Sequence, residues 1–199
     1  MANSNPVNMN NPFNFKQQNL FVLRLFLLMT IIEVVNLLSG RLLNQFALVP
    51  RNWDGLWGIL IAPFLHGNLW HFSSNILPLC LFSWLAMYYG KRCFWQASLW
   101  ILITTGILVW LFARDAMHLG ASGIVYGYFG FLLLAGFLSG RFRMMLLSLV
   151  VGFFYGGLIL GVLPVKAYIS WESHLFGFIA GLMAAYLFVQ KQQSEKHKI

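Results

Sequence analysis

Charged side chains are scarce in this sequence. Aspartate, glutamate, lysine and arginine make up 9% of the 199 residues, whereas hydrophobic residues make up 59%. Soluble domains usually carry about 25% charged residues, so this chain has too little charge to cover a water-exposed surface. The composition excludes an ordinary soluble domain and predicts an integral membrane protein with one compact domain.

Cysteine is also rare. The chain has two, Cys80 and Cys93, in or beside apolar segments and without a Cys-x-x-Cys motif. This excludes a disulfide scaffold and a cysteine metal framework, and we interpret both as small buried hydrophobic residues.

The N-terminal residues lack the features of a signal peptide. They are polar, without a basic start or a short apolar core that ends in a cleavage site. We expect a flexible cytoplasmic tail over 1–18, a membrane domain over 19–190 and a cytoplasmic tail over 191–199.

Long apolar runs dominate the rest. A bilayer core about 30 Å thick needs about 20 apolar residues in a helix. An apolar segment at 55–65 is too short to cross, and we expect it in an outer loop at the membrane interface, with Trp53 and Trp57 at headgroup depth. The fold class is therefore all-α and polytopic, with six spans at 19–39, 71–90, 94–112, 122–140, 144–162 and 173–190.

The basic residues of the short loops set the orientation. By the positive-inside rule both termini lie in the cytoplasm, which fits a bacterial inner membrane. The net charge of +8 is spread over membrane-end loops, so it does not predict nucleic-acid binding. Residues on the inner side include Lys16, Lys91, Arg92, Arg141 and Arg143.

Five polar residues fall in the outer half of the predicted membrane domain. Such groups are costly in lipid, so each needs a partner or a hydrated cavity. At helical spacing His71 and Asn75 share one face. The five are His66, His71, Asn75, Ser122 and His174.

Small residues predict which of these helices meet. Ser122 and Tyr126 are one turn apart, and His174 shares a face with Gly177 and Gly181. Small residues let helices approach closely in a membrane. Ser122 and His174 would then lie opposite each other, with Tyr126 supporting the imidazole.

This pair has the chemistry of nucleophilic catalysis. A neutral imidazole at about 3 Å can take the proton of a serine hydroxyl. The only nearby acid is Glu172, which at adjacent spacing points elsewhere, so we predict a Ser122–His174 dyad without a third acidic member.

An oxyanion would need hydrogen-bond donors. The candidates are the Asn75 amide, the His71 ring and the Ser122 backbone N–H at a helix start. Gly120 and Gly123 would let a substrate backbone pass close to the serine.

Other interpretations are available for each residue alone. Ser122 could cap a helix, and Asn75 could bind a neighbouring helix. A zinc site of His66, His71 and His174 is disfavoured, because no His-Glu-x-x-His motif is present. We expect no metal. A transporter would need an inverted repeat or helices broken at the midplane, and the sequence has neither.

The complete set resembles the rhomboid family of intramembrane serine proteases. The second span matches the family pattern of His, His five later and Asn four later, and the fourth matches Gly-x-Ser-Gly with Tyr four after the serine. The sixth matches His-x-x-Gly-x-x-x-Gly. The resemblance covers roughly 50–185. The matching residues are His66, His71, Asn75, Gly120, Ser122, Gly123, Tyr126, His174, Gly177 and Gly181.

The resemblance implies a six-helix rhomboid core with an interfacial first outer loop, in which Ser122 is the nucleophile and His174 the base. His71, Asn75 and the Ser122 amide would form the oxyanion hole, and His66 would keep the cavity polar. Substrates would be transmembrane proteins, cut near the outer end of a helix within the lipid bilayer. No cofactor is implied, and no oligomeric state. A rhomboid-like protein that binds helices without cutting them is the alternative.

Two features concern entry and the first outer loop. Entry would lie between the second and fifth spans, where Phe153, Phe154 and Tyr155 could form a gate. The family often has a Trp-Arg pair before the first His, but here Trp57 is followed by Gly58. This difference from the family pattern concerns the first outer loop and not the Ser122–His174 dyad. Glu33, within the first span, has no partner that the sequence identifies.

Overall fold

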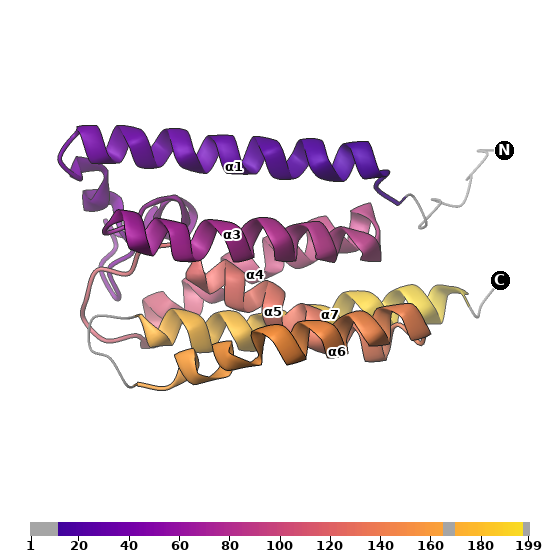
Figure 1. The fold of residues 1–199 in the computed structure, drawn as a ribbon. Coiled ribbons are helices and arrows are strands. Elements are labelled where there is room, and N and C mark those ends of the chain that lie inside the picture. The colour runs from indigo at the N-terminus through magenta and orange to yellow at the C-terminus, as the bar shows by residue number, and fades with distance from the viewer. Residues whose placement is uncertain (1–11, 165–169, 197–199) are drawn as a thin grey trace, which may run out of the picture.

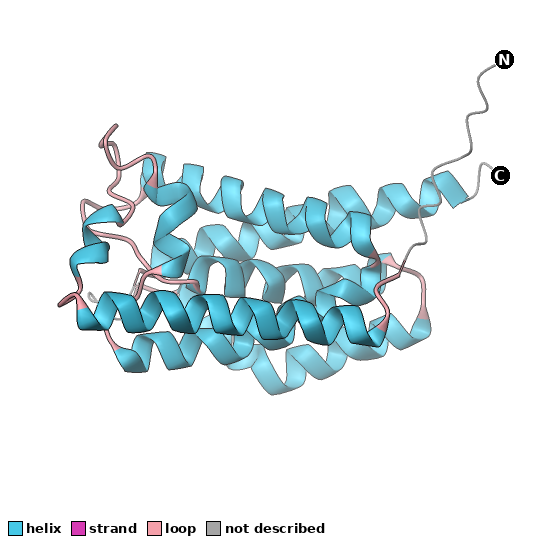
Figure 2. Ribbon diagram, turned by 90° about the horizontal axis from the view of Figure 1, so that it is seen from above, coloured by secondary structure: helices cyan, strands magenta, loops and turns pink. Residues whose placement is uncertain are grey.

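The computed structural model describes residues 12–164 and 170–196, and in that part regular structure is helical. Long helices run side by side along one common direction, and the loops gather at the two ends (Figures 1 and 2). They are α1 (Phe15–Leu38), α3 (Leu69–Ala86), α4 (Lys91–Phe112), α5 (Ser122–Leu138), α6 (Phe142–Tyr155) and α7 (Trp171–Lys196).

Short helical segments complete the elements. They are η1 (Leu42–Phe46), α2 (Gly58–Ile61), η2 (Ala62–Phe64), η3 (Met87–Tyr89) and η4 (Gly156–Val162). The segment expected as a loop at 55–65 therefore contains the helical turns α2 and η2. Trp53 and Trp57 beside it are 73% and 71% exposed.

Each expected run overlaps a helix, with shifts at the ends, and the second and fifth runs end in the short segments η3 and η4. The first helix begins at Phe15 instead of residue 19, because Asn14 caps it and Gln17 completes a capping box. By length and hydropathy four helices of the described part could cross a membrane. They are α1, α4, α6 together with η4 (Phe142–Val162), and the Trp171–Val189 part of α7. Helix α5 is apolar but shorter. The chain is therefore an integral membrane protein, all-helical where the structure describes it.

Helix α5 lies at the centre of the fold. It packs against α3, α4, α6 and α7, and most of its residues are buried. The outer helices present large apolar side chains outward, among them Leu38, Phe153 and Trp70, each more than 80% exposed. An apolar belt of this extent is suited to lipid contact.

Glycines bring α5 and α7 into backbone contact. A Cβ placed on Gly177 would lie 2.1 Å from the Gly123 carbonyl oxygen, and one on Gly181 would lie 1.9 Å from that of Gly127. Any side chain at these positions would separate the two helices. This close approach sets the distance between the start of α5 and the start of α7.

Candidate active site

Ser122 is the first residue of α5 and is 7% exposed. The loop before Ser122 is bound to η2, since the Gly120 N–H donates to the Ala62 carbonyl at 2.9 Å. Gly120 has a φ of +109°, a backbone conformation that favours glycine. As a first-turn amide the Ser122 N–H has no partner within its own helix, so it is available to an oxyanion.

His174 lies in the first turns of α7 and is oriented by two groups. Its Nδ1 donates to the Gly161 carbonyl at 2.9 Å, and its ring stacks on Tyr126 with centroids 4.1 Å apart and an interplanar angle of 6°. A carbonyl oxygen only accepts, so in the neutral ring the proton is on Nδ1 and the lone pair is on Nε2. This tautomer leaves Nε2 able to accept a proton.

The serine and the histidine lie at the same level of the α5–α7 contact. A Cβ on Gly123, next to Ser122, would be 3.4 Å from the carbonyl oxygen of Ser173, which precedes His174. The imidazole of His174 stacks on Tyr126, which lies one turn after Ser122. No hydrogen bond joins the two side chains in the described structure.

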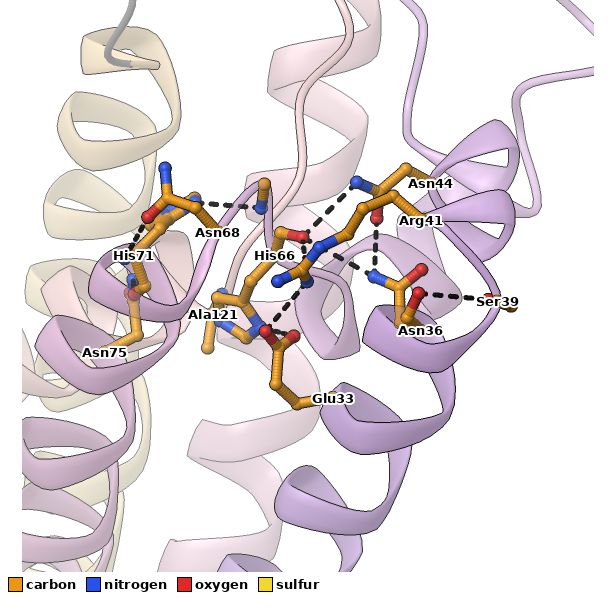
Figure 3. Close-up of polar contacts among 11 residues, drawn as sticks. Glu33, Asn36, Ser39, Arg41, Asn44, His66, Asn68, His71, Asn75 and Ala121 are labelled. Atoms are coloured by element: carbon orange, nitrogen blue, oxygen red, sulfur yellow. Dashed lines mark hydrogen bonds and ion pairs between the residues drawn. The ribbon is translucent and has the colours of Figure 1, made fainter.

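His71 lies against the loop that precedes the serine. A Cβ on Gly120 would come within 2.7 Å of the His71 Nε2 and Cε1 atoms. The His71 Nδ1 accepts a long hydrogen bond of 3.5 Å from the Gly67 N–H, which puts the ring proton on Nε2, the atom beside Gly120. The Asn75 amide donates one hydrogen to the His71 carbonyl at 2.6 Å (Figure 3) and keeps its second.

His66 is fully buried behind this loop. Its Nε2 accepts from the Ala121 N–H at 3.5 Å, and its ring lies edge-on to that of His71, with centroids 5.2 Å apart. Burial above all, with His71 and Arg41 nearby, lowers the pKa of His66 to about 3. The ring is therefore neutral at physiological pH, as an acceptor for the Ala121 amide must be.

The structure adds residues that the motif analysis left without a role. Arg41, in the loop after α1, is the partner of Glu33, with Nη1 2.7 Å from Oε1. His118 is 2% exposed; its Nε2 donates to the Arg114 carbonyl, and its Nδ1 accepts from the Ser170 hydroxyl. It thereby ties the α4–α5 loop to the start of α7. Burial lowers the pKa of His118.

Sequence comparisons place the chain in a known family. A Rhomboid domain model matches residues 54–191. The chain belongs to the rhomboid family. An uncharacterised protein of Mycobacterium tuberculosis is 36% identical over 175 residues, which cover 83% of this chain and 73% of the relative. A candidate rhomboid protease of Bacillus subtilis, YdcA, is 28% identical over 151 residues, covering 70% of this chain and 71% of the relative.

The three α6 residues expected to contribute to a gate differ in their surroundings in this rhomboid. Phe153 and Phe154 of α6 are 84% and 73% exposed and face outward. Tyr155 instead packs against Phe82 of α3, with ring centroids 4.9 Å apart. Of the three, Tyr155 is the residue that connects α6 to α3.

Proposed function

We propose that this rhomboid is an intramembrane serine endopeptidase that cuts transmembrane helices of membrane-protein substrates near their outer ends. Ser122 is the nucleophile, and His174 is the general base and then the general acid. The main support is the tautomer of His174, because the Gly161 carbonyl holds the proton on Nδ1 and leaves Nε2 free for the serine proton.

The reaction follows acyl transfer. The Ser122 Oγ attacks the scissile carbonyl carbon while its proton moves to His174 Nε2. The tetrahedral intermediate collapses as Nε2 returns the proton to the leaving amine nitrogen, which breaks the peptide bond. Water then attacks the ester carbon as Nε2 takes its proton, and Nε2 returns that proton to the departing Ser122 Oγ, which restores the hydroxyl and releases the second fragment as a carboxylic acid.

The oxyanion of each intermediate has three donors in this proposal. They are the unpaired Ser122 N–H, the His71 Nε2–H that lies against Gly120 and the second amide hydrogen of Asn75. The Gly161 carbonyl takes the orienting role that a carboxylate has in a triad. The catalytic side chains thus form a dyad, and a backbone oxygen orients the histidine.

The membrane setting completes the proposal. Six helices, α1 and α3 to α7, would cross the bilayer as one domain over 19–190, with both termini in the cytoplasm of a bacterial cell. The substrate helix would enter from the bilayer between α3 and α6, past Tyr155. Water would come from the outer side, because the hydrocarbon core holds none.

One observation favours a second candidate, a rhomboid-like protein that binds membrane helices without cutting them. The Ser122 hydroxyl and His174 share no hydrogen bond in the described structure, although catalytic hydrogen bonds often tighten only with substrate bound. Such a protein would bind a substrate helix equally well with or without Ser122.

Labelling and cleavage distinguish the two candidates. Wild-type protein in detergent should react with a fluorophosphonate probe at Ser122 and should cut a co-reconstituted single-span substrate. Ser122→Ala should lose both activities, and Ser139→Ala, at the other end of the same helix, should keep both. Cleavage that persists in Ser122→Ala would refute the nucleophile, and a wild type that binds helices without labelling or cleavage would favour the second candidate.

A further inference from the structure

Glu33 is a buried carboxylate on α1, a helix with few buried residues. It is 2% exposed, whereas its neighbours Ile31, Val34 and Val35 are 46–60% exposed. A carboxylate in this position needs partners, because lipid supplies none. The side chain points to the inside of the molecule, toward His66 (Figure 3).

A tight turn brings the partner to it. Gly40 and Arg41 both have positive φ, +65° and +69°, and the Arg41 N–H donates to the Asn36 carbonyl at 2.7 Å. The left-handed conformation is unfavourable for arginine. It reverses the chain at the end of α1, so that the guanidinium reaches back to the Glu33 carboxylate at 2.7 Å.

The same guanidinium holds the backbone of His66. Arg41 Nη1 also donates to the His66 carbonyl at 2.9 Å, and the side-chain amides of Asn44 and Asn36 point to that oxygen from 3.3 and 3.5 Å. Three side chains from α1 and the first outer loop therefore converge on one peptide oxygen. The carbonyl oxygen of His66 is thus fixed from several sides, while the Glu33 Oε2, Asn36 Oδ1 and His66 Nδ1 atoms of the same cluster are buried and make no hydrogen bond in the described structure.

The His66 ring continues the connection to the serine loop. Its Nε2 accepts from the Ala121 N–H at 3.5 Å, which leaves the proton on Nδ1. Nδ1 faces the second Glu33 oxygen at 3.9 Å. The negative carboxylate of Glu33 favours a proton on the nearby Nδ1 of His66. Nε2 then has the lone pair that accepts from the Ala121 N–H.

We propose that Glu33 and Arg41 are positioning residues for the serine loop. Arg41 fixes the His66 backbone, Glu33 favours the tautomer that holds the Ala121 amide, and together they set the place of Ser122. This rests on the proposed protease activity. It also gives the first outer loop, which lacks the Trp-Arg pair, an anchor of a different kind on α1.

Kinetics of four variants test the proposal. Glu33→Gln and Arg41→Gln should each lower kcat about 10- to 100-fold with KM unchanged, since small displacements at a catalytic centre have effects of this size. The double variant should be no worse than the poorer single, because the two act as a unit. Arg24→Gln removes a cation from the exposed face of the same helix, and its kcat and KM should match those of wild type.

The contrary results are equally definite. A folded Glu33→Gln protein with kcat within about twofold of wild type, or with a raised KM and normal kcat, would overturn the proposal. If a single variant does not fold, the double variant, which removes both charges, is judged by the same kcat criterion.

A spectroscopic measurement separates this proposal from the protease activity itself. The measurement uses the Ser122→Ala protein with ¹⁵N-labelled histidine. The signals of His66 are assigned as those that disappear in His66→Gln. They should show His66 protonated at Nδ1 only. Adding Glu33→Gln should populate both tautomers. An unchanged His66 tautomer would refute the role of Glu33, whether or not the wild type cuts substrates.

Discussion

The imidazole of His174 and the phenol ring of Tyr126 lie face to face, with centroids 4.1 Å apart and planes within 6° of parallel. Tyr126 is one turn after Ser122 on α5, so the ring that supports the proposed base belongs to the helix that carries the proposed nucleophile. The stack therefore sets the position of His174 relative to α5. Its loss should affect the chemical step more than the binding of substrate.

The stack predicts different effects for two substitutions at one position. Tyr126→Phe keeps the ring and should retain most of kcat, whereas Tyr126→Ala frees the imidazole and should lower kcat about 10- to 100-fold. Cleavage rates of the purified variants measure this. Equal losses in both variants would show that the hydroxyl, not the ring, is what matters.

Gly161→Ala should be less damaging when Tyr126 is shortened to phenylalanine. A Cβ at this position would lie 1.8 Å from the Tyr126 hydroxyl and 3.5 Å from His174 Nδ1, so Gly161→Ala should move η4 and with it the carbonyl that orients the base. We expect a large loss of fluorophosphonate labelling, partly restored by Tyr126→Phe.

Gly157→Ala is the matched control for this prediction. Gly157 belongs to the same short helix, and nothing lies within 4 Å of the Cβ it would gain. This variant should be labelled like wild type. A Gly161→Ala protein with normal labelling would mean that the carbonyl does not orient the base.

The helices were the most predictable part of the structure, because apolar runs in lipid have few alternatives to a helix. The small residues of α5 and α7 likewise predicted which faces would meet, since only glycine permits their backbone contact. The short turns at 58–64 were not predicted, because a segment of that length has no periodicity of its own. There local packing, such as Gly58 against Leu48, decides the structure.

Partners that depend on chain reversal were also beyond sequence reasoning. Arg41 meets Glu33 through a turn with two positive φ angles, and only the glycine at position 40 signals it. The acceptor for His174 was missed because it is a backbone oxygen, and the sequence search for a third catalytic group considered only carboxylates. Whether Ser122 and His174 act as a dyad stays a prediction.

Gly177→Ala should destabilise the fold. The added methyl would meet the Gly123 carbonyl oxygen at 2.1 Å, and backbone cannot rotate away as a side chain could. Overpacking of this kind costs about 1–3 kcal/mol, so we expect a lower midpoint of thermal unfolding and weaker labelling of Ser122. Met183→Ala, on an exposed face of α7, should change the midpoint little, and equal midpoints for the two variants would contradict close α5–α7 packing.

Acidification should weaken the fold through His66. Burial, with His71 and Arg41 nearby, lowers its pKa from 6.5 to about 3. Between these values the unfolded chain binds a proton that the folded ring does not, so the free energy of unfolding is unaffected above pH 6.5 and decreases below it. The decrease approaches about 1.4 kcal/mol per pH unit for one such group.

Thermal midpoints measured at several pH values from 7.5 to about 4.5 test this, with His66→Gln as the comparison. The variant lacks the titrating ring, so its midpoint should depend less steeply on pH, even if it is lower at neutral pH because the acceptor for Ala121 has changed. Parallel midpoint curves for the two proteins would mean that His66 is not the group that takes up the proton on unfolding.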